Sequence, residues 1–202
     1  HPFRIIDRQL LTAGIVGSSV AAFAMASAFS IVTPLEKQFN AHLHQTAFDF
    51  GISFSVLMLG RLLFQIPLGR LSDYLGRKPL IIGGLILMAP ATALLGEVRT
   101  TLQLIELRAI QGIGAAGVAA STFALAADLS STGSAGRQIS ITTMGFGLGI
   151  ALGPLLAGLL ALLSFKLPFL VIGMTLLVSA WIVYYYVPET VQRKTRFHDR
   201  EQ

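Results

Sequence analysis

The sequence has no cysteine and little charge. Without cysteine the chain can form neither a disulfide nor a thiolate metal site. Charged residues make up 12% of its 202 residues, against roughly a quarter in a typical soluble domain. The four histidines lack metal-ligand spacing, because His42 and His44 lie together in a polar stretch and the other two are close to the ends. These absences disfavour a soluble globular protein and predict no metal site.

Catalytic motifs are also missing. The apolar parts contain no Ser/His/Asp set, and no glycine-rich phosphate-binding loop occurs. Strand-like alternation of polar and apolar residues is absent as well. We therefore expect that the protein is not an enzyme.

Six long apolar runs dominate what is there. Hydrophobic residues make up 53% of the chain, with a mean hydropathy of +0.70. The runs cover residues 11–32, 50–68, 80–95, 102–127, 139–163 and 167–187. Each is close to the about 20 residues with which a helix crosses about 30 Å of hydrocarbon. Because backbone polar groups must pair within lipid, each run is predicted to be a helix. The fold class is therefore an all-α membrane protein with six transmembrane helices.

The distribution of Lys and Arg predicts the topology. Six spans place both termini on one side of the membrane. That side has ten basic residues: Arg4, Arg8, Arg70, Arg77, Lys78, Arg137, Arg193, Lys194, Arg196 and Arg200. The other side has three, which are Lys37, Arg99 and Lys166. Both termini are thus predicted to be cytoplasmic, in a plasma membrane or bacterial inner membrane. This asymmetry explains the pI near 10.0 without a nucleic-acid partner.

A short basic stretch, residues 69–78, separates the second and third runs. Gly69 and Gly76 are predicted to let the backbone turn in a tight cytoplasmic loop. Asp73 and Arg77 are four residues apart and can pair on a helical turn. The alternative is an ordinary basic loop, but the order of glycines, acid and bases favours a specific motif.

That order resembles the signature loop of the major facilitator superfamily, G-x-L-[SA]-D-x-x-G-R-[RK]. The matching residues are Gly69, Leu71, Ser72, Asp73, Gly76, Arg77 and Lys78. The resemblance implies the amino-terminal half of a twelve-helix transporter, built as a 3+3 inverted repeat, with likeness to the drug:proton antiporter branch. Residues 1–190 would form the bundle, and 191–202 a basic tail or the start of the linker to a second half.

The fourth run carries polar residues on one face. At about 100° per residue, Arg108, Gln111 and Gly112 lie together, which predicts a cation facing a cavity among small residues. The string from Leu104 onward also resembles a superfamily motif of the fourth helix. The resemblance implies a role for Arg108 in proton transfer, and pairing of Asp128 with the signature loop in one transport state.

Three further charges lie inside or beside the apolar runs. Arg61 is deep in the second run, where a charge is costly; it either faces a watery interior or serves structure by snorkelling or pairing. Asp49 lies near the outer interface. Glu106 is an interface acid or a second functional group. Asp49 and Glu106 are the local candidates for proton coupling, and a coupling acid in a second half is the alternative.

The fifth run carries glycines four residues apart and a Gly-Pro pair. The string resembles the family's antiporter motif, g-x-x-x-G-P-x-x-G-G, departing from it at Ala157. The residues concerned are Gly145, Gly149, Gly153, Pro154 and Gly158. We expect a bent helix whose glycine strip slides against the second half; generic packing is the alternative.

These features predict a proton-coupled exporter of small, drug-like or metabolite molecules that works by alternating access. It would need no cofactor, because a proton gradient would drive it. The expected partners are the lipid bilayer, a small-molecule substrate, and either a carboxy-terminal six-helix half or a second copy. The alternatives are a half-size homodimer or non-transporting scaffold, and a solute uptake symporter or uniporter.

Overall fold

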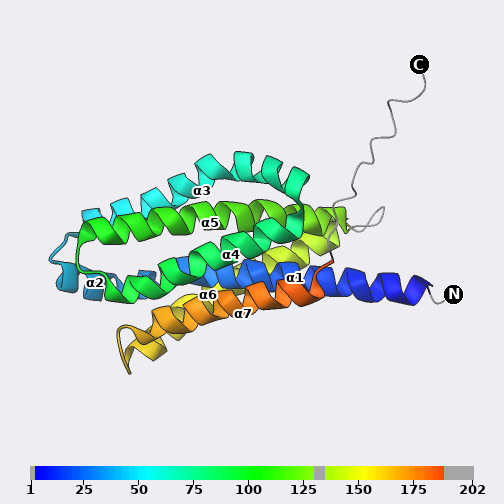
Figure 1. Cartoon of the computed structure of the whole chain (residues 1–202). Coiled ribbons are helices and arrows are strands. Elements are labelled where there is room, and N and C mark those ends of the chain that lie inside the picture. Colours follow the sequence, from blue (N-terminus) through cyan, green and yellow to red (C-terminus); the bar gives the residue numbers. More distant parts are fainter. Residues whose placement is uncertain (1–2, 130–134, 189–202) are drawn as a thin grey trace, which may run out of the picture.

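The computed structural model describes residues 3–129 and 135–188, and these fold into helices joined by short connections (Figure 1). The α-helices are α1 (Phe3–Ser30), α2 (Glu36–Leu43), α3 (Ala47–Leu75), α4 (Arg77–Leu94), α5 (Thr101–Asp128), α6 (Ala135–Ala161) and α7 (Leu167–Tyr186); short 3-10 turns cover Thr33–Leu35 and Leu95–Glu97. Six are long and apolar enough to cross a membrane. The predicted all-α membrane fold with six spans is thus confirmed. The predicted tail, 191–202, lies outside the described residues.

The signature stretch is not the loop that the sequence predicted. Helix α3 continues through it to Leu75, α4 begins at Arg77, and Gly76 alone separates them. Gly76 has φ 114°, a backbone conformation that side-chain-bearing residues rarely adopt. Polar residues at the membrane surface can remain helical because water satisfies their side chains. The change of direction therefore needs one residue rather than a loop, and Gly69 is an ordinary helical position.

Two triplets of helices repeat the same pattern. In the apolar windows of α1, α3 and α4, 72%, 17% and 50% of residues are buried; in α5, α6 and α7 the values are 67%, 22% and 44%. The main pairings exchange members between triplets, with α3 against α5 and α6 against α1. Three helices per triplet also make α1 and α5 run in opposite directions. This is the 3+3 inverted repeat.

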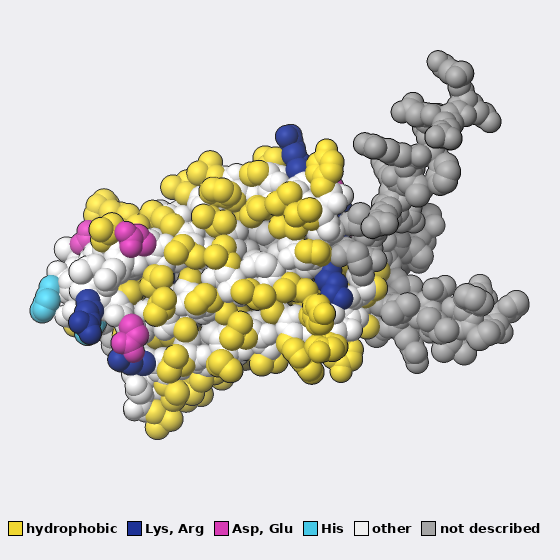
Figure 2. Space-filling model, in the orientation of Figure 1, with side chains coloured by type: hydrophobic (Ala, Val, Ile, Leu, Met, Phe, Trp, Pro, Cys, Tyr) yellow, Lys and Arg dark blue, Asp and Glu magenta, His cyan; other side chains and the backbone are white. Residues whose placement is uncertain are grey.

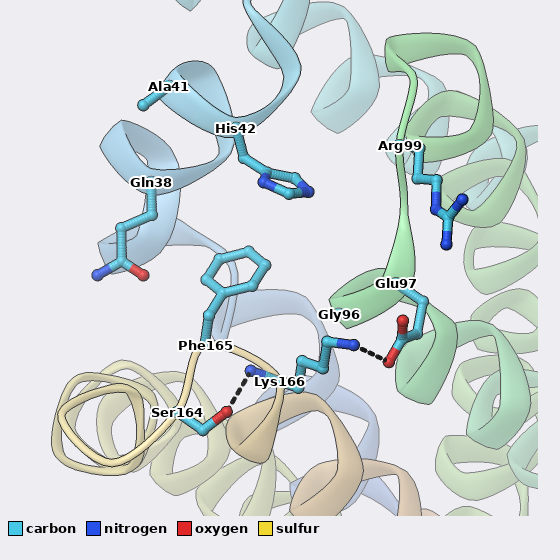
Figure 3. A pocket seen from close by; sticks show the side chains of 9 residues that line it. All are labelled: Gln38, Ala41, His42, Gly96, Glu97, Arg99, Ser164, Phe165 and Lys166. Carbon is cyan, nitrogen blue, oxygen red and sulfur yellow. Dashed lines mark hydrogen bonds and ion pairs between the residues drawn. The ribbon is translucent and has the colours of Figure 1, made fainter.

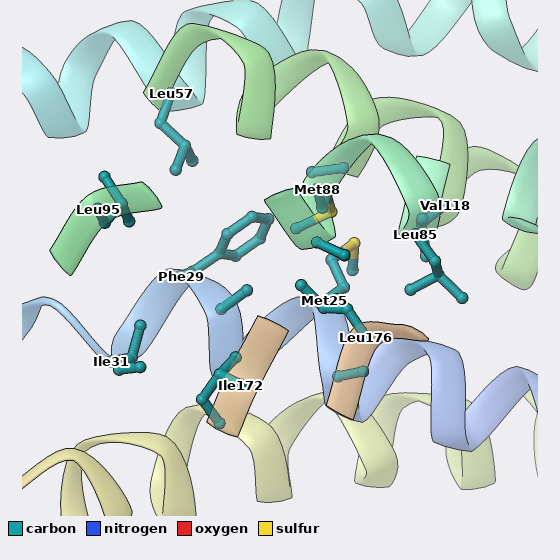
Figure 4. Packing of buried hydrophobic residues seen from close by; sticks show 14 of the residues in the cluster. Met25, Phe29, Ile31, Leu57, Leu85, Met88, Leu95, Val118, Ile172 and Leu176 are labelled. Carbon is teal, nitrogen blue, oxygen red and sulfur yellow. The ribbon is translucent and has the colours of Figure 1, made fainter. Parts of the chain in front are cut away.

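The core lies where the central helices α1 and α5 meet α4 and α7. Phe29 of α1 lies close to Met88 of α4, and Ile172 and Leu176 of α7 close the other side (Figure 4). Close approach matters in lipid, where helix association depends on packing rather than on exclusion of water. A Cβ added at Gly84 would collide with the carbonyl oxygen of Gly114, so α4 and α5 pack backbone against backbone.

The surface divides into an apolar middle and polar ends. Figure 2 shows hydrophobic side chains over the middle of the bundle, with acids, bases and histidine gathered at the end that carries α2. We call this the α2 end, and the opposite one the Gly76 end. The polar stretch that holds His42 and His44 includes α2, whose Phe39 is fully buried against the rings of Phe165 and Phe169.

Candidate functional site

Arg77 ties three helices together at the Gly76 end. Its Nη1 lies 2.6 Å from Asp73 Oδ1 on α3, and its Nε donates to Asp128 Oδ2 on α5 at 3.0 Å. Nη1 also donates to the Ser72 hydroxyl at 2.6 Å. The structure thus brings Asp73, Arg77 and Asp128 together, as the family resemblance implied. Only 15% of the Arg77 side chain is exposed, against 59% for Asp73 and 41% for Asp128, so the cluster is open to water on its acidic side.

Lys78 does not join this cluster. Its Nζ lies 5.3 Å from the centre of the Tyr184 ring on α7. Two adjacent basic residues therefore point to different partners, Arg77 to acids and Lys78 to an aromatic ring. The prediction grouped them because the motif is contiguous in sequence, but consecutive helical side chains point about 100° apart.

Arg108 begins a buried polar chain between α5 and α4. Its Nη1 donates to Gln111 Oε1 at 3.0 Å, Gln111 Nε2 donates to Thr92 Oγ1 at 2.8 Å, and that hydroxyl donates to the Met88 carbonyl at 2.8 Å. The guanidinium also lies 5.0 Å from the Phe54 ring of α3. Its Nε and Nη2 have no partner in the part of the chain that the structure describes.

The burial of this chain corrects one prediction and adds a residue. Arg108 and Gln111 were expected on a cavity wall, yet both are fully buried between α3, α4 and α5. Their predicted shared face is present, but it is turned toward neighbouring helices. Thr92 was missed because the apolar run 80–95 carries no charge and gave the appearance of ordinary packing. A lone hydroxyl in such a run is a weak signal, since it can bond to its own helix.

Gly112 sets the distance between α3 and α5. A Cβ there would collide with the Leu57 carbonyl and lie 3.2 Å from the backbone nitrogen of Arg61. The two backbones are therefore in contact at this turn, and any larger residue would separate them. The close crossing places Arg61 of α3 about one helical turn from Arg108 of α5.

Arg61 faces the interior of the bundle. Its guanidinium carbon lies 5.6 Å from the ring centre of Phe29 on α1 and 5.8 Å from that of Phe146 on α6. The side chain is partly buried. Of the two alternatives from the sequence, snorkelling to the surface does not fit this geometry. Arg61 forms no hydrogen bond or ion pair with another described residue.

Neither of the two local acids forms an ion pair with these arginines. Asp49 caps α3: Oδ2 accepts from the backbone nitrogen of Thr46 at 2.9 Å, and the Thr46 hydroxyl accepts from the Asp49 nitrogen at 3.3 Å. A carboxylate engaged in this capping box has a structural function, so the structure does not place Asp49 in a cavity. Glu106 is exposed near the start of α5, as expected of an interface acid.

The glycine strip of α6 packs inside the bundle. A Cβ added at Gly145, Gly149 or Gly153 would collide with α1, meeting Ser19, Phe23 and Ser30 respectively. The Ser30 hydroxyl also donates to the Gly149 carbonyl at 3.1 Å. The predicted sliding contact with a second half is therefore wrong for this strip. Spacing in the sequence identified the small face but not its neighbour.

Two residues of this motif, Pro154 and Gly158, lie beyond the glycine strip. Pro154 lies inside α6, which continues to Ala161. A Cβ at Gly158 would meet nothing within 4 Å, so Gly158 is not part of the α1 contact.

A shallow cavity of about 920 Å³ opens at the α2 end (Figure 3). His42 and Phe165 lie side by side in it, and Lys166 pairs with Glu97 at 2.6 Å. None of its lining residues belongs to the polar chain or to the Arg77 cluster. We therefore place the candidate site at the middle of the bundle, around Arg61 and Arg108, and its control element at the Gly76 end.

Comparison with known proteins agrees with this membrane-transporter architecture. The family model for the Major Facilitator Superfamily matches residues 18–202, and the chain belongs to that family. It is 36% identical over 116 residues to the inner membrane transport protein YajR of Escherichia coli, covering 55% of this chain and 25% of that protein. It is 30% identical over 152 residues to a bicyclomycin resistance protein homolog of Haemophilus influenzae, covering 75% of this chain and 36% of the relative.

Solved structures share the fold. A bacterial homolog of the human lysosomal transporter Spinster, inward-facing and occupied, superposes with a TM-score of 0.75 at 17% identity, over 87% of this chain and 44% of that one. The chain thus spans between a quarter and about half of the length of these proteins. The family to which the chain belongs is one of transporters and not of enzymes.

Proposed function

We propose that this chain forms one six-helix half of a proton-coupled exporter of small molecules that works by alternating access. Transporters of this kind hold substrate near the middle of the membrane while two bundles rock about it. The Arg77 cluster supports the proposal most strongly. It joins α3, α4 and α5 at one end, and partly exposed ion pairs of this kind are weak enough to open and close reversibly.

The outward direction of transport is supported by the likeness of residues 149–158 to the antiporter motif and by a relative named for bicyclomycin resistance. In this proposal the Gly76 end faces the cytoplasm, where the basic residues concentrate. The Arg77 cluster then holds the cytoplasmic side closed in one state and releases in the other.

Proton coupling requires an acid whose protonation changes the balance between the two states. The described middle of this bundle has none, since Asp49 caps a helix and Glu106 is exposed near the α2 end. We therefore place the coupling acid in a second six-helix half. Arg108, buried with two unpaired nitrogens, would respond to it by electrostatics.

The surface of α3 and α6 is the proposed contact with that second half. These two helices are the least buried of the six. Their exposed residues include Leu62, Leu63 and Ile66 on α3, and Leu155 and Leu159 on α6. A second copy of this bundle could cover the same surface, which keeps the homodimer as the second candidate. Crosslinking of the native protein, followed by its mass, separates the two.

The test uses the native full-length protein in proteoliposomes with an imposed pH gradient. We expect movement of a fluorescent small-molecule probe against its own gradient, and its collapse on addition of a protonophore. Movement that is indifferent to the protonophore would indicate a uniporter, and no movement of any probe would favour the scaffold.

A further inference from the structure

The middle of the bundle carries positive charge without negative charge. Helix α3 has no acid between Asp49 near its start and Asp73 near its end, and Arg61 lies twelve residues from each. Arg108 follows Glu106 by two residues, but Arg108 is fully buried whereas Glu106 is exposed. Neither arginine has an ion pair among the described residues. Cations in a low-dielectric interior are unfavourable without an anion nearby.

The two arginines differ in access. Arg108 is fully buried and already donates to Gln111, so a ligand could reach it only after the helices repack. Arg61 is partly exposed and uses none of its five N–H donors on another described residue. The rings of Phe29 and Phe146 engage its charge through cation–π contacts, which leave those donors available.

Arg61 also lies where a transported molecule would pass. It is the central residue of α3, with fourteen helical residues on each side. Its guanidinium reaches Phe29 on α1 and Phe146 on α6, although α3 and α6 have at most marginal direct contact. A guanidinium can bind an oxyanion with two parallel hydrogen bonds, and the adjacent rings offer apolar surface to the rest of the ligand.

We propose that Arg61 binds the anionic group of the transported molecule, so that the substrates are amphipathic organic anions with an apolar or aromatic body. This inference rests on the proposed transport function and names its substrate class. The anion would neutralise the acid-free middle of the bundle. The charge of Arg108, which is buried nearby and has no carboxylate partner, would add to the attraction of the anion.

The test compares two dyes with the same xanthene skeleton and opposite charge, fluorescein and rhodamine 123, on the native full-length protein. Binding is measured by fluorescence anisotropy in detergent, and transport in proteoliposomes with a pH gradient. We expect the wild type to prefer fluorescein by at least tenfold. Arg61→Gln should weaken fluorescein binding about tenfold and leave rhodamine 123 unchanged or improved, while Arg61→Lys should lose less.

Arg99→Gln is the matched control, because it removes one positive charge from an exposed position outside the helices. It should change the binding and transport of neither dye. Thermal melting and size-exclusion profiles of each variant show whether the fold is retained. If Arg61→Gln does not fold, Arg61→Lys carries the test through a smaller but still selective loss of fluorescein binding, whereas Phe146→Leu, which removes apolar surface that both dyes would contact, should weaken both.

Several results would overturn the inference: a wild-type preference for rhodamine 123, no fluorescein binding, or equal loss of both dyes in well-folded Arg61→Gln. Arg61-dependent fluorescein binding without pH-driven movement would uphold the anion site and refute the proposed proton-coupled export. Export of rhodamine 123 alone would uphold export and refute the anion site.

Discussion

The arginine at the Gly76 end and the two arginines at the middle of the bundle have opposite surroundings. Arg77 is close to water and has two carboxylates and a hydroxyl around it. Arg61 and Arg108 are deeper, and no carboxylate pairs with either among the described residues. If charges served stability alone, the deep ones would be the paired ones. The end cluster thus joins helices, whereas the arginines at the middle are left without a carboxylate partner, which fits the proposed binding of an anionic ligand.

Removal of the deepest charge should have the largest effect. Arg108→Ala in the full-length protein should lower proton-driven transport about 100-fold, because the variant loses both the charge and the hydrogen bond that holds Gln111 in place. Folding should suffer less, since the arginine has two unpaired nitrogens that no longer need burial. Transport rates beside thermal melting check this. Equal loss of transport and of folded protein would assign Arg108 a purely structural role.

At the other region, neutralising one acid should uncouple the helices without unfolding them. Asp73→Asn should lower the transport rate about tenfold, because it removes one of the two ion pairs of Arg77. Insertion and melting temperature should stay near the wild type, since exposed ion pairs contribute little to stability. Glu97→Gln, which removes the ion pair of Lys166 at the α2 end, is the matched control. Wild-type rates in Asp73→Asn would refute the proposed role of the Arg77 cluster in closing the cytoplasmic side.

A smaller effect is expected along the buried polar chain. Thr92→Val keeps the shape of the side chain but removes the acceptor of Gln111. One lost buried hydrogen bond is worth about 1 kcal/mol, which corresponds to roughly a fivefold change. We expect a fall of that size in transport, and Thr92→Ser, which keeps the hydroxyl, should restore it. An unchanged rate in Thr92→Val would show that Thr92 has no role in transport.

The smallest effect should come from Lys78. Its exposed cation–π contact with Tyr184 contributes about 0.5–1 kcal/mol at most. This contact is separate from the Arg77 cluster, so its energy should affect stability rather than the change of state. Lys78→Gln should change the transport rate less than about twofold, in contrast to Asp73→Asn. Transport assays of the two variants run side by side check this. A loss as large as that of Asp73→Asn would assign Lys78 the same role as the Arg77 cluster.

Sequence alone predicted the features that depend on local patterns. Apolar length gave the six spans, and the order of glycines, acid and bases in 69–78 identified Asp73 and Arg77. Asp128 came from the family resemblance alone. Helix periodicity gave the shared face of Arg108 and Gln111. Which neighbour each face meets depends on the packing of distant helices. For that reason the burial of Arg108, the role of Thr92 and the contact of the Gly149 strip with α1 became clear only in the structure.

The central claim is that Arg61, at the middle of the bundle, binds the substrate and that Arg77, at the Gly76 end, controls the change between the two transport states. The most direct test is the initial rate of pH-driven fluorescein export as a function of dye concentration, for the full-length wild type, Arg61→Gln and Arg77→Gln. The account predicts that Arg61→Gln raises KM about tenfold with little change in kcat, and that Arg77→Gln lowers kcat about tenfold with little change in KM. The same parameter changing in both variants would contradict it.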